Sequence, residues 1–128
     1  MLFLSFKLLF TFFFFIFQSI RMVLEINDSN FKQEVENYEG VAIVDFWAPW
    51  CGACVASTPA VEAVSSDLKD KAKFLKLNVD ENQEVASRFG VMSIPTFIFF
   101  RNGKEEERKV GMQTPEIIKG AIEGLLKK

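Results

Sequence analysis

The sequence contains no histidine, and it has only two cysteines among its 128 residues, Cys51 and Cys54. Without an imidazole, the chain cannot build a Ser-His-Asp triad or a Cys-His nucleophile. Two cysteines are too few for a disulfide-rich secreted scaffold. A zinc site would have two thiolates and no nitrogen ligand, so a second chain would be needed to complete the tetrahedron. Any chemistry of the pair must therefore come mainly from the thiols themselves.

Neither acidic nor basic residues are unusually frequent in the sequence. The chain is 49% hydrophobic and 25% charged, with a formal net charge of −2. This balance is typical of a globular protein and not of a disordered chain. The slight acidity disfavours a basic nucleic-acid-binding protein, and we expect no nucleic acid as a partner. The length fits a single domain, and no internal repeat is visible.

Phenylalanine is unevenly distributed, since eight of the fifteen lie in residues 1–17. A signal peptide is one interpretation of residues 1–21, but a small-x-small cleavage site is missing. A membrane anchor is the second, although the apolar stretch after Lys7 is half the roughly 20 residues that span a bilayer. The third, which we favour, is that translation starts at Met22. We therefore expect a domain of residues 22–128 in the cytoplasm, with membrane anchoring or export through residues 1–21 as the alternative.

After Met22, apolar runs alternate with helical patterns. The run 41–47 is apolar except for Asp45, which is typical of a strand buried on both faces. Asn102-Gly103 is a signal for a tight hairpin. Pro59 lies inside the long helix and should kink it. The pattern predicts an α/β layered domain with a mixed sheet. Its expected strands are 23–26, 41–47, 74–79, 96–100 and 105–110, and its expected helices run from after 27–30 to about 38, and over 51–69, 83–89 and 115–126.

The two cysteines stand in the segment Trp50-Cys51-Gly52-Ala53-Cys54, at the start of a predicted helix. Two thiols separated by two residues can close a small disulfide ring with little rearrangement. The unpaired N–H groups and the positive end of the helix dipole stabilise a thiolate at Cys51. We therefore predict that Cys51 is the nucleophile, and that the better-shielded Cys54 resolves a mixed disulfide.

The sequence from 22 to 128 resembles the thioredoxin family. The resemblance rests on several motifs in order: Val44-Asp45-Phe46-Trp47, the Trp50-Cys51-Gly52-x-Cys54 centre, Pro59, Leu77-Asn78-Val79-Asp80, Ile94-Pro95-Thr96, Asn102-Gly103 and Gly111. Motif together with context is stronger than C-x-x-C alone. The resemblance implies a thioredoxin fold, a three-layer sandwich in which four helices flank a central mixed β-sheet.

The resemblance also implies a protein-disulfide reductase that keeps cell redox homeostasis and donates electrons to reductases and peroxidases. Its redox group is the Cys51–Cys54 disulfide, without metal or other cofactor, and its expected partners are thioredoxin reductase and protein disulfides, with the chain a monomer. Asp45 is expected to accept the Cys54 proton and Lys76 to tune Asp45. Pro95 corresponds to the family's cis-proline. The implied substrate-binding residues are Trp50, Gly52, Ala53, Ile94, Pro95 and Gly111.

Other interpretations stay open beside this one. The cysteines could be a structural pair or half of a metal-binding dimer, and Asp45 could be a hydrogen-bonded core acid. The chain could also be a non-enzymatic binding module, or an exchanger that faces an oxidising compartment. Two departures from the family's commonest pattern alter the redox centre: Ala53 replaces a proline, and Val55 stands where a basic residue is frequent. Met92 and Ser93 leave the docking surface apolar.

Overall fold

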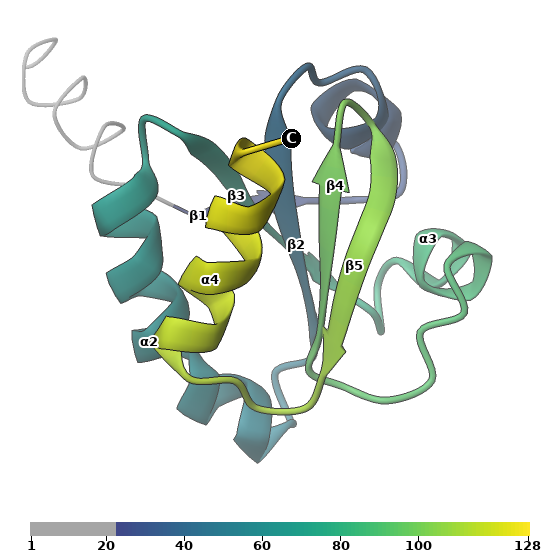
Figure 1. Cartoon of the computed structure of the whole chain (residues 1–128). Helices are drawn as coiled ribbons and strands as arrows, with labels where there is room; N and C mark the ends of the chain where they lie inside the picture. Colours follow the sequence, from purple (N-terminus) through teal and green to yellow (C-terminus); the bar gives the residue numbers. More distant parts are fainter. Residues whose placement is uncertain (1–22) are drawn as a thin grey trace, which may run out of the picture.

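A computed structural model describes residues 23–128, and the Phe-rich segment discussed above lies outside the described residues. Five strands form one sheet in the order β1-β3-β2-β4-β5, in which β1, β3 and β2 are parallel and β4 and β5 antiparallel. The predicted mixed sheet is confirmed (Figure 1). The elements are β1 (Val23–Ile26), η1 (Lys32–Glu36), β2 (Val41–Trp47), α2 (Gly52–Leu68), β3 (Ala72–Asn78), α3 (Gln83–Arg88), β4 (Thr96–Arg101), β5 (Lys104–Val110) and α4 (Pro115–Leu126).

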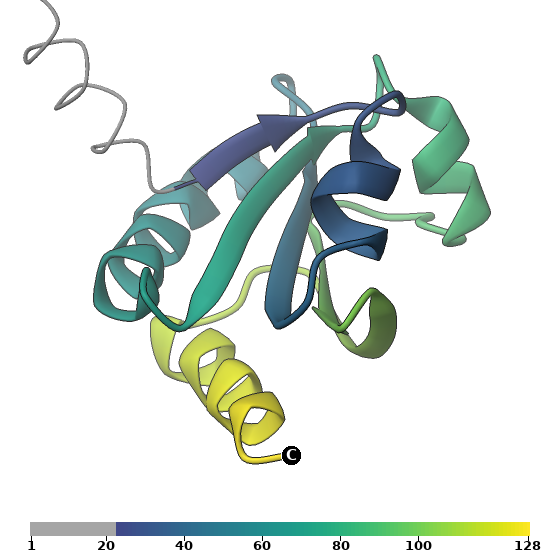
Figure 2. The same cartoon turned by 90° about the horizontal axis from the view of Figure 1, so that it is seen from above.

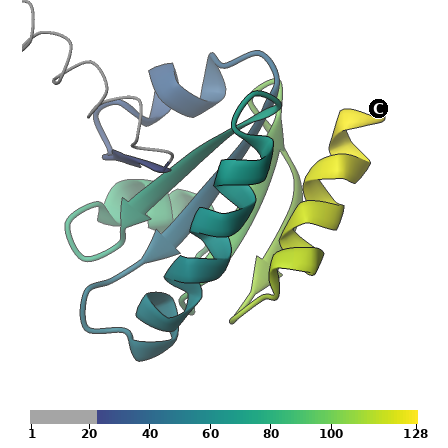
Figure 3. The ribbon, with the colours of Figure 1, turned by 90° about the vertical axis from the view of Figure 1, so that its left-hand side faces the viewer.

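The helices cover both faces of the sheet, which gives the predicted three layers. Helices α2 and α4 lie along one face, and η1 and α3 lie on the other (Figures 2 and 3). Alternate residues of each strand point to opposite faces, so two apolar clusters form. Strand residues Ile43, Phe74, Phe97 and Phe99 pack with α2 and α4. Residues Val44, Phe46, Leu75 and Ile98 pack with η1 and α3.

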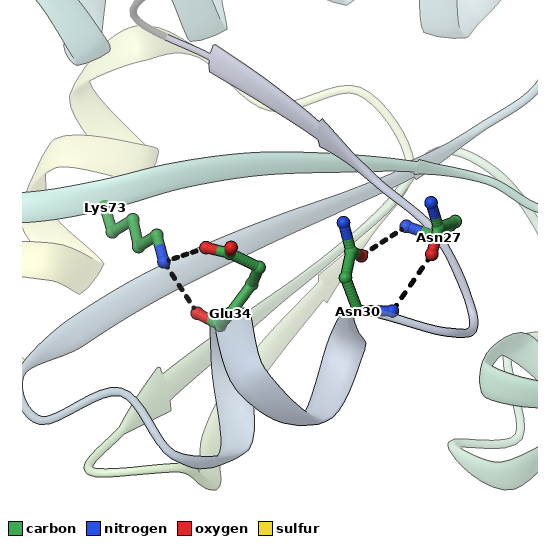
Figure 4. A network of polar contacts seen from close by, with 4 residues as sticks. All are labelled: Asn27, Asn30, Glu34 and Lys73. Carbon is green, nitrogen blue, oxygen red and sulfur yellow. Dashed lines mark hydrogen bonds and ion pairs between the residues drawn. The ribbon is translucent and has the colours of Figure 1, made fainter.

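The predicted first helix forms, but it ends at Glu36 and not at about Tyr38. One π-helical turn forms at Lys32–Glu36, and the backbone leaves the helix at Asn37, where φ is −92° and ψ is 2°. The polar residues 27–30 make the turn that precedes it. The Asn27 side-chain oxygen accepts hydrogen bonds from the main-chain N–H groups of Ser29 and Asn30, at 3.0 and 2.9 Å. From β3, Lys73 binds the Glu34 carboxylate at 2.5 Å and the Glu34 carbonyl at 3.0 Å (Figure 4). Side-chain hydrogen bonds like those of Asn27 stabilise the turn that leads into the helix.

The other boundaries agree with the predictions within two residues. Strands β1 and β2 have the predicted limits, whereas β3 begins at Ala72, two residues before the expected position. Helix α2 continues through Pro59, and the kink expected there stays a prediction. The hairpin between β4 and β5 forms at Asn102 and Gly103, whose φ angles are 51° and 81°. Positive φ at both positions is what a type I′ turn requires.

Asp28 connects the turn after β1 to helix α3. Its carboxylate accepts hydrogen bonds from the N–H groups of Val85 and Glu84, at 3.0 and 3.3 Å, while its own N–H donates to the Asn82 side chain at 2.9 Å. The N-cap residue of α3, Asn82, makes no side-chain capping bond of its own. Asp28 therefore caps α3 from a segment more than fifty positions earlier in the chain.

We predict that Asp28→Ala lowers the free energy of unfolding by about 1–2 kcal/mol, because it leaves N–H groups of α3 without an acceptor. Urea unfolding followed by circular dichroism measures the change. Asp67→Ala is the matched control, since it removes the same charge from an exposed carboxylate 4.0 Å from Lys119. Equal losses in the two variants would contradict the capping role.

Candidate active site

The two cysteines form a disulfide at the start of α2. Their Cα atoms are 5.2 Å apart, and both residues are buried, Cys51 at 7% exposure and Cys54 at 3%. Cys51 is the N-cap residue of α2, and its Sγ accepts a hydrogen bond from the Cys54 N–H at 3.2 Å. The predicted positions are confirmed: the first cysteine caps the helix and the second lies within it, slightly better shielded.

The segment before β4 lies against the disulfide. The Cys51 Sγ is 3.8 Å from the carbonyl oxygen of Ile94, and Ile94 packs on the cluster that contains both cysteines. The Ile94–Pro95 peptide bond is cis, as predicted. The Gly111 N–H donates to the Pro95 carbonyl at 2.8 Å. The fold therefore brings Ile94, Pro95 and Gly111 to the disulfide, although they follow Cys51 by more than forty residues.

Trp50 is 70% exposed, and its indole N–H donates to the Asp80 carboxylate at 2.6 Å. Asp80 is a site residue that the sequence analysis did not assign. Its place at the end of Leu77-Asn78-Val79-Asp80, directly after β3, is the signal that could have identified it. The hydrogen bond fixes the orientation of an aromatic side chain beside the disulfide.

The surface around the disulfide is apolar. Gly52 is exposed, and a Cβ added to it would contact nothing within 4 Å. Ala53 is partly buried and packs on the cysteine cluster. Met92 is 96% exposed, Val55 57% and Met112 56%. Met92 and Val55 were expected from the sequence, whereas Met112, which follows Gly111, was not. These exposed side chains are uncharged, whereas the Asp80 carboxylate lies beside Trp50.

Asp45 lies beneath the disulfide in a cavity of about 80 Å³, which is also lined by Cys54, Trp47 and Lys76. Asp45 is only 8% exposed, and within the described part of the chain its Oδ1 has no hydrogen-bond partner. Burial raises the pKa of Asp45 to about 7, although the nearby Lys76 cation works in the opposite direction. At neutral pH, this carboxyl group can therefore both accept and release a proton.

Lys76 is the cross-strand neighbour of Asp45 on β3. Its ammonium nitrogen lies 4.7 Å from the centre of the Trp47 ring and 4.0 Å from the Glu25 carboxylate. The structure thus places Lys76 beside the acid, as the resemblance implied. Its tuning role stays a prediction.

Residues 23–128 contain neither a metal-binding cluster of side chains nor a helix that could cross a membrane. No group of three or more histidine, cysteine, aspartate or glutamate side chains there is arranged to hold a metal ion. No helix in the same range has the length and apolar character needed to cross a membrane.

Comparison with known proteins gives a consistent result. A model of the family described as "Thioredoxin" matches residues 22–123. The chain is 45% identical to a thioredoxin of Rickettsia felis over 92 residues, which cover 72% of this chain and 88% of that protein. It is 44% identical to a thioredoxin of Staphylococcus saprophyticus over 101 residues, covering 79% and 95%. It is 41% identical to a thioredoxin of Bacillus subtilis over 100 residues, covering 78% and 94%.

Proposed function

The chain belongs to the thioredoxin family and is a thiol–disulfide oxidoreductase, and from that premise we propose how the residues around Cys51 and Cys54 divide the reaction. The Cys51 thiolate attacks a sulfur of the substrate disulfide, forms a mixed disulfide and releases the first substrate thiolate. The Cys54 thiolate then attacks the Cys51 Sγ and releases the second. Two electrons pass from the dithiol to the substrate, and the Cys51–Cys54 disulfide remains.

The position of Cys51 at the N-terminus of α2 supports its role as the nucleophile. In the disulfide, its sulfur accepts the Cys54 N–H at 3.2 Å, and the same donor can stabilise a thiolate after reduction. The positive end of the helix dipole acts in the same direction. Ala53 also leaves an N–H near the helix start, where the commonest family pattern has proline.

Asp45 is the proposed acceptor of the Cys54 proton. The shared cavity supports this role, because Asp45 and Cys54 line the same small space, and the Asp45 Oδ1 accepts no hydrogen bond from residues 23–128. A pKa of about 7 matches the operating pH, which is the condition for efficient proton transfer. Lys76 limits the rise of the Asp45 pKa and so keeps part of the carboxyl population ionised.

The proposed substrate-binding surface consists of Trp50, Gly52, Ala53, Ile94, Pro95 and Gly111. An extended substrate segment pairs with the backbone beside Pro95, as a strand pairs with a sheet edge. The Trp50 ring is exposed, and the small residues Gly52 and Ala53 leave room for a polypeptide to approach Cys51.

Thioredoxins generally work with thioredoxin reductase and with disulfide-containing proteins, and they need no cofactor beyond the redox-active disulfide. We propose the same partners for this chain, acting as a cytoplasmic monomer that donates electrons to reductases and peroxidases. The working unit is the domain of residues 22–128. A membrane role would require that residues 1–21 are translated and retained.

The disulfide at the start of α2, packed against the Ile94–Pro95 segment, is the observation that carries the proposal. The test is the reduction of insulin by the full chain, with NADPH and a bacterial thioredoxin reductase as the electron source. We expect insulin to precipitate and NADPH to be consumed, and protein alkylated at both thiols is the control.

Each alternative function predicts a different result. A binding module would leave NADPH consumption unchanged and would keep its partner after Cys51→Ser. A metal-binding dimer would carry zinc in proportion to the purified protein. Either result, without insulin reduction, would overturn the proposed activity.

A further inference from the structure

Three charged residues form a row across neighbouring strands. Glu25 on β1 is the register partner of Lys76 on β3, which is in turn the partner of Asp45 on β2. Register partners point to the same face of a sheet. The residues two positions earlier, Val23, Phe74 and Ile43, form a parallel row that packs against the layer of α2 and α4. All three charges are therefore directed to the face that carries the Asp45 cavity.

Lys76 stands between two acids in this row. Its ammonium nitrogen is 4.0 Å from the Glu25 carboxylate, while the inner Asp45 Oδ1 accepts no hydrogen bond from the described residues. The Lys76 ammonium nitrogen also lies over the Trp47 ring, 4.7 Å from the ring centre, in a cation–π contact. Glu25 lies on an edge strand, and its side chain is 54% exposed, so it holds the cation from the solvent side.

We infer that Glu25 is a positioning residue, which acts through Lys76 by holding its ammonium group toward the edge of the sheet and away from full pairing with Asp45. This inference rests on the proposed role of Asp45 as the proton acceptor of Cys54. It adds Glu25, which lies outside the C-x-x-C region, to the residues that affect the ionisation of Asp45.

The sign of the effect follows from the charges. Lys76 favours the ionised form of Asp45, so an anion that draws this cation outward weakens that support. The groups that face Asp45 from the other elements are Glu62 and Cys54 on α2, which line the cavity, and the uncharged Phe97 on β4. Removing the Glu25 charge therefore lowers the Asp45 pKa.

The experiment is an NMR titration of the Asp45 carboxyl carbon in the full-length oxidised protein, in which no thiol titrates. For Glu25→Gln, we expect the Asp45 midpoint to fall by about 0.3–0.7 pH unit at low salt, the size expected of a half-exposed ion pair. The shift should shrink near 1 M salt, where exposed charges are screened. Glu107→Gln is the matched control, because it removes the same charge from an ion pair on β5 at the other edge.

A second comparison tests whether Glu25 acts through Lys76. In a Lys76→Met background, Glu25→Gln should shift the Asp45 midpoint much less than in the wild type, because the intermediary is gone. An unchanged midpoint in Glu25→Gln, an equal shift in Glu107→Gln, or a full shift without Lys76 would each overturn the inference. If the pH profile of insulin reduction is unaffected by Asp45→Asn, the proposed proton acceptor fails instead, and the titration still decides the role of Glu25.

Discussion

Cys54→Ser is expected to reduce insulin disulfide reduction by about 10³-fold or more, while the protein still captures substrates through Cys51. The variant keeps the Cys51 sulfur at the start of α2 but removes the group that breaks the mixed disulfide. Serine is nearly the same size as cysteine, so the buried position is disturbed little. The reaction should therefore stop at its covalent intermediate, and not before it.

Mass spectrometry of the variant after incubation with a peptide disulfide measures this intermediate. We expect one peptide to be attached per chain, at Cys51, and to be released by dithiothreitol. Cys51→Ser is the matched comparison, which should lose turnover without accumulating any adduct under the same conditions. Stable capture by Cys51→Ser, or turnover by Cys54→Ser close to that of the wild type, would reverse the assigned order of attack.

Asp45→Asn is expected to raise the free energy of unfolding of the oxidised protein by about 3 kcal/mol at pH 8.5. Burial raises the Asp45 pKa from 3.8 to about 7, so the native state binds more protons than the unfolded state between these values. The stability of the wild type therefore falls as the pH rises through this window. Above pH 7 the protein must bury an ionised carboxylate, whereas asparagine carries no charge at any pH.

Urea unfolding at pH 4.5 and pH 8.5 measures the difference. The gain from Asp45→Asn should be much smaller at pH 4.5 than at pH 8.5, because pH 4.5 lies less than one unit above the unfolded pKa of 3.8, whereas pH 8.5 lies above both values. Asp67→Asn serves as the control, since Asp67 is exposed on α2. A gain of the same size at both pH values would contradict the raised pKa. The same variant should reduce insulin more slowly, because Cys54 loses its proton acceptor.

The strands were the most predictable part of the fold. The apolar run of β2 was long and strongly patterned, and its limits Val41–Trp47 match the prediction. Asn102-Gly103 specified the hairpin through its backbone preferences. The end of the first helix was predicted about two residues too late, because the local sequence favours a helix up to Tyr38. The turn at Asn27 and the contact of Lys73 with Glu34 depend on side-chain geometry and on a strand that is distant in sequence.

Some residues of the candidate site could likewise be predicted from the sequence, whereas others depend on the fold. Cys51 and Cys54 were evident from their spacing, and the resemblance pointed to Asp45 and Pro95. The partner of Trp50, Asp80, was not assigned, because the hydrogen bond depends on how the loop after β3 folds back toward the cysteines. Glu25 could not be assigned to the site from the sequence, since only the strand register places it beside Lys76. No local sequence pattern specifies which distant strands pair or in which register.

The hydrogen bonds of Asp28 connect the beginning of the domain to the region of the candidate active site. Asp28 follows the edge strand β1 and holds the first turn of α3, and the Val91 N–H after that helix bonds back to the Ala86 carbonyl at 2.9 Å. Three residues later the chain reaches Ile94, against the cysteines. The beginning of the domain is thus joined to the segment that packs against the cysteines through one carboxylate, in addition to the pairing of β1 with β3.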